Sequence, residues 1–258
     1  MSSAAALVAV SEVMNDSQAD LAALGPFFAL AVHPAGAAPA RPWRPLDELV
    51  GPGPALPDRI RAVRVALAAA GGREPGQIEE RVAVSVAHLG LVARLIAPAV
   101  GAAALGRPLG VLAAGRIWWQ DQLGRPYAVS LAPDGPRAAG TPPAGSPGLA
   151  GTAVEQLTLA CHRRFSVSPR VLWGNVASAA NSAAGLIGHG RPDLAAAARA
   201  AAGAILRDVR VDGGDRIAGP GFRRRSCCLI YRLAGSTAAV CGDCVLQPAA
   251  AVRVARDV

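Results

Sequence analysis

Four of the five cysteines stand within eighteen residues of one another near the C-terminal end of the sequence. They form two groups, the adjacent Cys227 and Cys228 and the Cys-Gly-Asp-Cys run from Cys241 to Cys244, with a spacer of twelve residues between them. Cysteines grouped in this way are typical of metal sites in which thiolates are the ligands. The chain must fold so that the two groups meet, and this requirement constrains the fold more than any other feature of the sequence.

The spacer predicts a hairpin that would bring the two groups together. Residues 229–233 are rich in β-formers, residues 234–236 favour a turn, and residues 237–240 can return as a second strand. Cys228 would then face Cys241, because directly opposed residues have Cβ atoms roughly 5 Å apart. In an extended strand Cys227 would point to the other face, so we expect the chain to bend at this pair. Gly242 permits a tight turn that aims backbone N–H groups at sulfur.

Three kinds of site are compatible with the four thiols. Structural zinc usually takes two arms of the Cys-x-x-Cys type, and a Cys-Cys dipeptide is an awkward zinc arm. A two-iron cluster spreads its four ligands over two metals and relaxes that requirement. A disulfide framework is favoured least, because no secretory signal is visible in the sequence. The residues alone favour an iron–sulfur cluster and leave the other two sites open.

The cysteine region resembles a known family. The run Arg-Arg-Arg-Ser-Cys-Cys-Leu-Ile-Tyr-Arg at 223–232, followed by Cys-Gly-Asp-Cys-Val-Leu at 241–246, is similar to the C-terminal signature of the FhuF-like siderophore ferric-iron reductases. In that family the form Cys-Cys, spacer, Cys-x-x-Cys holds a 2Fe-2S cluster. The usual spacer there is ten residues, and one extra residue on each arm would keep the end cysteines opposed. Segments 85–98 and 172–179 resemble recurring stretches of the same family more loosely.

The resemblance implies a function and a set of ligands. It implies one 2Fe-2S cluster held by Cys227, Cys228, Cys241 and Cys244, and one-electron reduction of a ferric siderophore, with a hydroxamate type expected. The electron would come from a ferredoxin or a flavin reductase, because the sequence has no nicotinamide- or flavin-binding motif. The alternatives are a zinc-containing or non-catalytic siderophore-binding or iron-homeostasis accessory, and a redox sensor that uses the cluster as its signal.

The basic residues narrow the range of partners. All 26 are arginine, and the formal net charge is +8. A P-loop is excluded because it needs lysine. The positive charge favours anionic partners, but the arginines are scattered and only residues 223–225 form a run. We therefore expect no nucleic-acid partner.

Two uncharged stretches bear on localisation. Residues 21–40 and 171–190 each lack acidic and basic side chains over twenty residues. Prolines and a histidine interrupt the first, and asparagines, serines and a histidine make the second too polar for lipid. We expect the second to be a buried helix. The protein is expected to be cytoplasmic, with at most peripheral membrane association.

The fold class predicted is α+β, mostly helical, with small antiparallel hairpins and a C-terminal cysteine-rich hairpin that holds the metal cluster. Residues 1–220 form the main domain, with a Pro/Gly-rich linker at 133–151, followed by the cluster-binding segment 221–248 and a tail at 249–258. The segments 115–120 and 127–131 predict a hairpin. Residues 27–32 are compatible with either a helix or a buried strand. Helical periodicity or composition predicts helices at 4–13, 57–70, 77–97 with an end before Pro98, 154–165, 170–188, and 193–209 with Asp193 as N-cap.

Further residues are candidates for secondary roles. Trp173 and Asn175 lie in the upstream resemblance; for Asn175 we expect a mainly structural role, with substrate contact as the alternative. Arg225 and Arg232 are expected to raise the cluster potential, and Asp243 to lower it. We expect Arg223 and Arg224 to lie further from the ligands and to affect donor binding more than the potential. His88 is expected to be a buried histidine and Cys161 an inert thiol.

Overall fold

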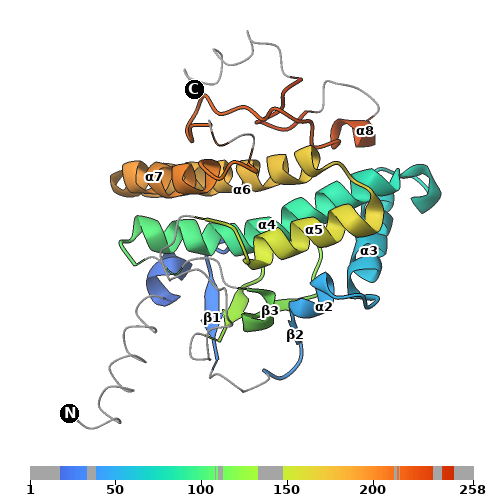
Figure 1. Cartoon of the computed structure of the whole chain (residues 1–258), viewed down its shortest axis with the longest axis horizontal. Coiled ribbons are helices and arrows are strands. Elements are labelled where there is room, and N and C mark those ends of the chain that lie inside the picture. The colour runs from blue at the N-terminus through green and yellow to red at the C-terminus, as the bar shows by residue number, and fades with distance from the viewer. Residues whose placement is uncertain are drawn as a thin grey trace.

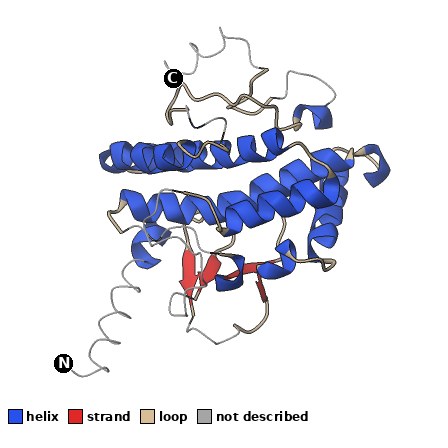
Figure 2. Cartoon of the chain, in the orientation of Figure 1, coloured by secondary structure: helices blue, strands red, loops and turns tan. Residues whose placement is uncertain are grey.

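The structure is a computed structural model of the chain. It describes residues 18–33, 39–107, 109, 113–132, 148–211, 214, 216–234 and 240–246. Within these residues the molecule has two stacked helical layers with a small sheet beneath them (Figure 1). The C-terminal segment runs over the outer side of the upper layer, on the opposite side of the molecule from the sheet (Figures 1 and 2).

Helix α4 (Glu80–Ala104) is the centre of the helical part. It packs against α3 (Ala55–Ala70), α5 (Ala153–Phe165), α6 (Pro169–Gly190) and α7 (Ala195–Leu206). Short helical pieces flank these elements: α2 (Asp47–Val50), η1 (Pro75–Gln77), η2 (Ala114–Arg116), η3 (Pro192–Leu194) and α8 (Tyr231–Ala234). Because α4 contacts helices of both layers, its apolar side chains are buried on more than one face.

Local signals define the helices next to the cysteine segment. Thr152 caps α5 by accepting a hydrogen bond from the Glu155 N–H, and Ser166 ends that helix in the left-handed region at φ 51°. Pro169 occupies the first turn of α6, where its missing N–H leaves no hydrogen bond unmade. Helix α6 therefore starts sharply at Pro169, and its first two turns are the part of the helix that contacts the cysteine segment.

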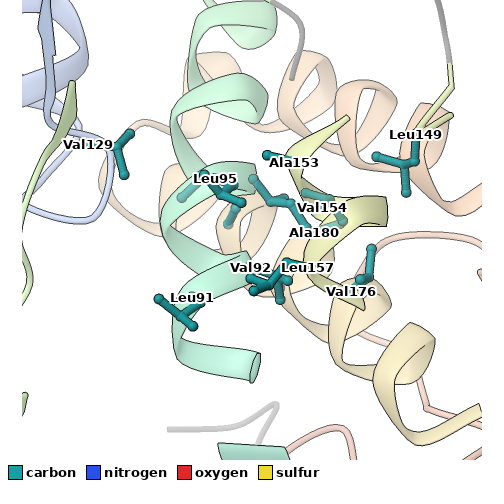
Figure 3. Packing of buried hydrophobic residues seen from close by; sticks show 14 of the residues in the cluster. Leu91, Val92, Leu95, Val129, Leu149, Ala153, Val154, Leu157, Val176 and Ala180 are labelled. Carbon is teal, nitrogen blue, oxygen red and sulfur yellow. The ribbon is translucent and has the colours of Figure 1, made fainter. Parts of the chain in front are cut away.

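The buried residues at the contact of α4, α5 and α6 are mostly aliphatic. Small residues on α5 and α6 allow the helices to approach closely, and leucines and valines fill the space between them. Figure 3 labels several residues of this core: Leu91, Val92 and Leu95 of α4, Ala153, Val154 and Leu157 of α5, and Val176 and Ala180 of α6.

The sheet has four strands in the order β1-β4-β3-β2. Strand β1 (Leu30–Val32) pairs in parallel with β4 (Val129–Leu131), while β3 (Ile117–Gln120) pairs antiparallel with β4 and with β2 (Trp43–Pro45). Trp119 is completely buried, and its ring lies about equally far from the guanidinium groups of Arg44 and Arg59, at 5.5 and 5.6 Å. The sheet thus closes the side of α4 that faces away from the cysteines (Figure 2).

The mainly helical architecture with a small sheet is confirmed, as is the antiparallel pairing of the two strands between residues 115 and 131. Residues 30–32 are a strand, so one of the two alternatives for 27–32 holds. The sheet is mixed and not purely antiparallel, because β1 joins its edge in parallel. The helix predicted at 4–13, the tail at 249–258 and residues 133–147 of the linker lie outside the described residues.

Two predicted helix ends are wrong. Helix α4 continues through Pro98 to Ala104, with residues buried on both sides of the proline. A proline inside a helix costs about 3 kcal/mol, and burial of the following apolar turn outweighs that cost. The last long helix starts at Ala195 and ends at Leu206, after the separate turn η3. Asp193 does not cap it; its carboxylate pairs with Arg191 at 2.6 Å.

Helix α4 is the described helix that is long and apolar enough to span a membrane by length and composition. Of its most apolar window, 67% is buried inside the protein. Core helices satisfy the same test, and the contacts of α4 with four other helices are those of a core helix. The stretch 171–190, predicted to be a buried helix, is most of α6.

Two glycines of α4 predict opposite effects on stability. A Cβ at Gly101 would lie 3.0 to 3.1 Å from side-chain atoms of Leu21, Leu24 and Phe28, whereas Gly90 faces open space. Gly101→Val should lower the free energy of unfolding by about 1–3 kcal/mol through overpacking. Gly90→Ala should raise it by up to about 1 kcal/mol, because alanine favours the helix. Urea unfolding measures both, and a Gly101→Val protein as stable as the parent would show that this contact is loose.

Candidate metal centre

The segment that carries the cysteines is anchored to the first turns of α6. The Ser226 hydroxyl donates to the Arg170 carbonyl at 2.7 Å, and Arg224 Nη2 donates to the Val171 carbonyl at 3.1 Å. Both carbonyls belong to α6, and the segment lies alongside this helix (Figure 1). Gly174 makes room for the contact, because a Cβ there would lie 2.2 Å from Ser226 Oγ and 2.9 Å from Arg224 Nη2.

Further hydrogen bonds join the two cysteine groups to each other. The Arg224 N–H donates to the Asp243 carbonyl at 3.0 Å, and Arg223 Nη1 donates to the Cys244 carbonyl at 3.1 Å. The Cys244 N–H closes the turn by donating to the Cys241 carbonyl at 3.0 Å. The residues just before the first cysteine group thus hold the second group in place.

Cys228 and Cys241 lie side by side, with their Sγ atoms 3.5 Å apart. The prediction that these two residues face each other is confirmed. Two thiolates on one tetrahedral metal lie about 3.8 Å apart, given metal–sulfur bonds of about 2.3 Å. The observed pair is therefore close to the separation that a shared metal requires. Cys161, by contrast, is buried in α5, where burial raises the pKa of its thiol to about 12.

The predicted hairpin does not form in the described part of the spacer. Residues 231–234 make one helical turn, α8, and residues 235–239 lie outside the described residues. Leu229 has a φ of 68°, which lies in the left-handed region, whereas every residue of a β-strand needs a negative φ. Arg232, at α8, pairs with Glu79 at 2.6 Å and draws this turn toward the start of α4. These two features bend the chain where a strand was predicted.

Backbone N–H groups point at two of the sulfurs. The Leu229 N–H donates to Cys227 Sγ and the Leu246 N–H donates to Cys244 Sγ, each at 3.3 Å. The left-handed Leu229 is the bend expected at the Cys-Cys pair. Hydrogen bonds of this kind stabilise thiolates and adjust the potential of iron–sulfur clusters.

One pair of the described cysteines already has the spacing of two ligands on a shared metal. All four cysteines lie in the described residues, and there no group of three or more His, Cys, Asp or Glu side chains is gathered closely enough to hold one metal ion. A single tetrathiolate zinc needs four sulfurs around one point. A two-iron cluster needs thiolates in pairs, and Cys228 with Cys241 forms such a pair. The residues therefore fit a 2Fe-2S cluster.

The thiols differ in how readily they lose a proton. The hydrogen bond from Cys241 lowers the pKa of the Cys228 thiol to about 6, and the same shared proton raises the pKa of Cys241. Burial raises the pKa of Cys227. Metal ligation requires the thiolate forms, so the pair supplies one thiolate easily and the others give up protons on binding.

A buried polar bridge supports Cys228 from beneath. The Ser85 hydroxyl of α4 donates to the Cys228 carbonyl at 2.8 Å, and Asn175 Nδ2 of α6 donates to the Ser85 carbonyl at 3.0 Å. His88 continues the bridge, with Nε2 3.0 Å from Thr158 Oγ1 of α5. Burial lowers the pKa of His88 to about 3, so its ring is neutral at pH 7. Ser85 was not singled out from the sequence, because nothing local marks its contact with a residue 143 positions away.

The other predicted site residues occupy varied positions. Trp173 is 7% exposed on α6, with the Arg210 guanidinium 5.2 Å from its ring centroid. Asn175 is completely buried. Arg225 and Arg232 are exposed, and Arg232 is paired with Glu79. Arg224, expected to be further from the ligands, is instead 2% exposed and close enough to influence the cysteines.

We predict that changing any of Cys227, Cys228, Cys241 or Cys244 to serine reduces the bound iron and acid-labile sulfide to less than half of the parent content. The reason is the loss of a thiolate from a four-ligand set. Cys161→Ala is the control and should leave both contents unchanged. Full cluster content in one of the serine variants would remove that cysteine from the ligand set.

A second prediction concerns Asn175. Asn175→Ala should lower the free energy of unfolding by about 1–3 kcal/mol, because it opens a cavity in the core and removes the amide that the buried Ser85 carbonyl and hydroxyl bind in addition to the helical bond of that carbonyl. Asn181→Ala on the same helix is the comparison. Asn181 is partly exposed, accepts a bond from the Gly219 N–H and bonds the Asp243 carboxyl; water can replace these bonds, so the loss should be smaller. Denaturant unfolding gives both values. Parental stability with loss of ferric-chelate reduction would instead make Asn175 a substrate contact.

Comparison with known proteins adds one finding to this geometry. No curated protein and no solved structure matches the chain. One family model does match, and it covers residues 224–246, the part of the chain that carries all four clustered cysteines, Arg224 and Ser226. The resemblance predicted from the cysteine spacing is therefore confirmed, and the C-terminal segment matches the FhuF 2Fe-2S C-terminal domain.

Proposed function

We propose that the protein is a ferric-siderophore reductase that transfers single electrons through a 2Fe-2S cluster held by Cys227, Cys228, Cys241 and Cys244. The observation that carries the proposal is the match of residues 224–246 to the FhuF 2Fe-2S C-terminal domain. The paired thiols of Cys228 and Cys241 and the N–H groups directed at Cys227 and Cys244 support it.

The chemistry requires little besides the electron. Siderophores of the hydroxamate type offer hard oxygen donors, which hold Fe(III) much better than Fe(II). When bound, the cluster would supply one electron to the chelated Fe(III) and be left oxidised by one electron. The weakly held Fe(II) then leaves the chelate, and protons from solvent occupy the freed oxygen atoms.

The chain's own contribution is to expose one side of the site and bury the other. Cys227 and Cys241 are partly exposed, whereas Cys228 and Cys244 are buried against the helical layer. A chelate can therefore approach the sulfurs from the outer surface without entering the protein. The buried side keeps the ligands fixed through Ser85 and the backbone bonds of Arg223 and Arg224.

The partners proposed follow from the same surface. Arg170 and Arg225 are exposed close to the anchored segment, and the chain carries a net charge of +8. Such a surface favours an acidic one-electron donor, and a ferredoxin fits this description better than a neutral flavin reductase does. We propose a cytoplasmic location, with at most peripheral association with a membrane.

The test is anaerobic oxidation of the reduced protein by a panel of ferric chelates, in the presence of a chromophoric Fe(II) chelator. Ferric hydroxamates should bleach the reduced-state spectrum and yield one Fe(II) per electron lost. Ferric catecholates should react more slowly, because they hold Fe(III) more tightly. Cys228→Ser should abolish the reaction, and Cys161→Ala should retain it. Oxidation by none of the chelates at a rate above buffer alone would contradict the proposal.

A further inference from the structure

We infer that Arg224 is a buried counter-charge to the cluster, fitted into a notch on α6 at Gly174, and that it raises the reduction potential of the cluster. The inference rests on the cluster assigned under the proposed function and assigns a role to a residue outside the ligand set.

Arg224 is buried to an unusual degree for an arginine. Its side chain is 2% exposed, which places it among the largest fully buried side chains of the described residues. Nη2 donates to the Val171 carbonyl at 3.1 Å, but Nε has no hydrogen-bond partner within the described part of the chain. Burying a charged guanidinium costs several kcal/mol unless an opposite charge compensates it. The position therefore calls for a nearby anion.

The main chain holds Arg224 next to both cysteine groups. The Arg224 N–H donates to the Asp243 carbonyl at 3.0 Å, inside the second group, and Cys227 follows Arg224 by three residues. The charge of Arg224 acts on Cys227, Cys228 and Cys241, on the Asp243 carboxyl, and on His88 of α4. The protein thus places a buried cation close to the cysteines.

Besides the Asp243 carboxyl, a cluster with four thiolates would provide a larger negative charge close to Arg224. Its overall charge is about −2 when oxidised and about −3 when reduced. Arginine keeps its proton at every accessible pH, so the Arg224 charge is the same before and after the electron arrives. One electron enters from a donor of the ferredoxin class, no bond is made or broken, and the fixed positive charge favours the more negative state. The reduced form is stabilised more than the oxidised form, and the potential rises.

Gly174 is the reason that this arginine can lie where it does. A Cβ at this position would stand 2.9 Å from Arg224 Nη2 and 3.3 Å from Nε, as well as 2.2 Å from Ser226 Oγ. A glycine in a helix interior costs about 1 kcal/mol relative to alanine. The missing side chain lets the guanidinium lie directly against α6.

Arg232 offers a matched contrast on the same segment. It is exposed, and its guanidinium already pairs with Glu79 at 2.6 Å. An exposed, paired charge is screened by water and salt. The inference therefore reverses the order expected from the sequence, in which Arg232 would influence the potential and Arg224 would affect donor binding more than the potential.

The test is an anaerobic redox titration of the full-length protein, followed by visible absorption and electron paramagnetic resonance. Arg224→Gln should lower the equilibrium constant for cluster reduction by about tenfold or more, which is about 59 mV for one electron. Arg224→Lys keeps the charge and should stay close to the parent, as should the control Arg232→Gln. The shift in Arg224→Gln should persist at high salt, because a buried charge is screened little.

Each outcome decides the role of Arg224. If Arg224→Gln loses the cluster while Arg224→Lys keeps it at the parental potential, the charge is required and the inference stands. Loss of the cluster in both variants would mean that Arg224 acts through its hydrogen bond to the Val171 carbonyl and not through its charge. An unchanged potential in Arg224→Gln would show that the charge of Arg224 does not affect the cluster. Either result overturns the inference. The expected shift in Arg224→Gln, found together with a reduced parent protein that ferric chelates do not oxidise, would refute the proposed function alone.

Discussion

The docking of the C-terminal segment onto the first turns of α6 is the interaction on which the site depends. Residues 224–246 are too few to bury a hydrophobic core of their own. Their order comes from contacts with helices that are already packed: Ser226 and Arg224 on α6, and the Cys228 carbonyl on Ser85 of α4. Gly174 is the residue that allows this approach. The helical layers therefore act as a rigid support for sulfurs that could not be positioned by local structure alone.

The support is polar where it meets the cysteines and apolar elsewhere. The interface of α4, α5 and α6 is filled by aliphatic side chains, and its polar members are the bridge of Ser85, Asn175, His88 and Thr158. Buried polar groups are costly unless they are hydrogen-bonded, so such a bridge fixes one relative position of the three helices. Since the bridge ends on the Cys228 carbonyl, the bridge also fixes the position of Cys228 relative to the helices. The sheet, on the far side of α4, completes the core without touching the site.

The sequence was sufficient for features that depend on spacing and periodicity. It predicted the main helices, the β3–β4 pairing, and the apposition of Cys228 and Cys241. Cys228 and Cys241 do lie side by side, but the predicted hairpin does not bring them together in the described part of the spacer. The left-handed Leu229 and the Arg232–Glu79 ion pair replace the first strand, and both arise from contacts that no local pattern reveals. The same limit explains α4, whose burial overrides Pro98. It also explains why the burial of Arg224 was not predicted. Nothing in a run of three arginines indicates which one is buried, and the space for its side chain depends on Gly174, fifty residues earlier in the chain.

The central claim is that the docked cysteine segment holds one two-iron cluster per chain. Spin quantitation of the anaerobically purified, dithionite-reduced protein by low-temperature electron paramagnetic resonance tests it most directly, combined with metal analysis of the same sample. The account predicts close to one S = 1/2 centre per chain, accompanied by two iron and two acid-labile sulfide. One zinc per chain, with neither iron nor a paramagnetic signal in the reduced protein, would contradict it.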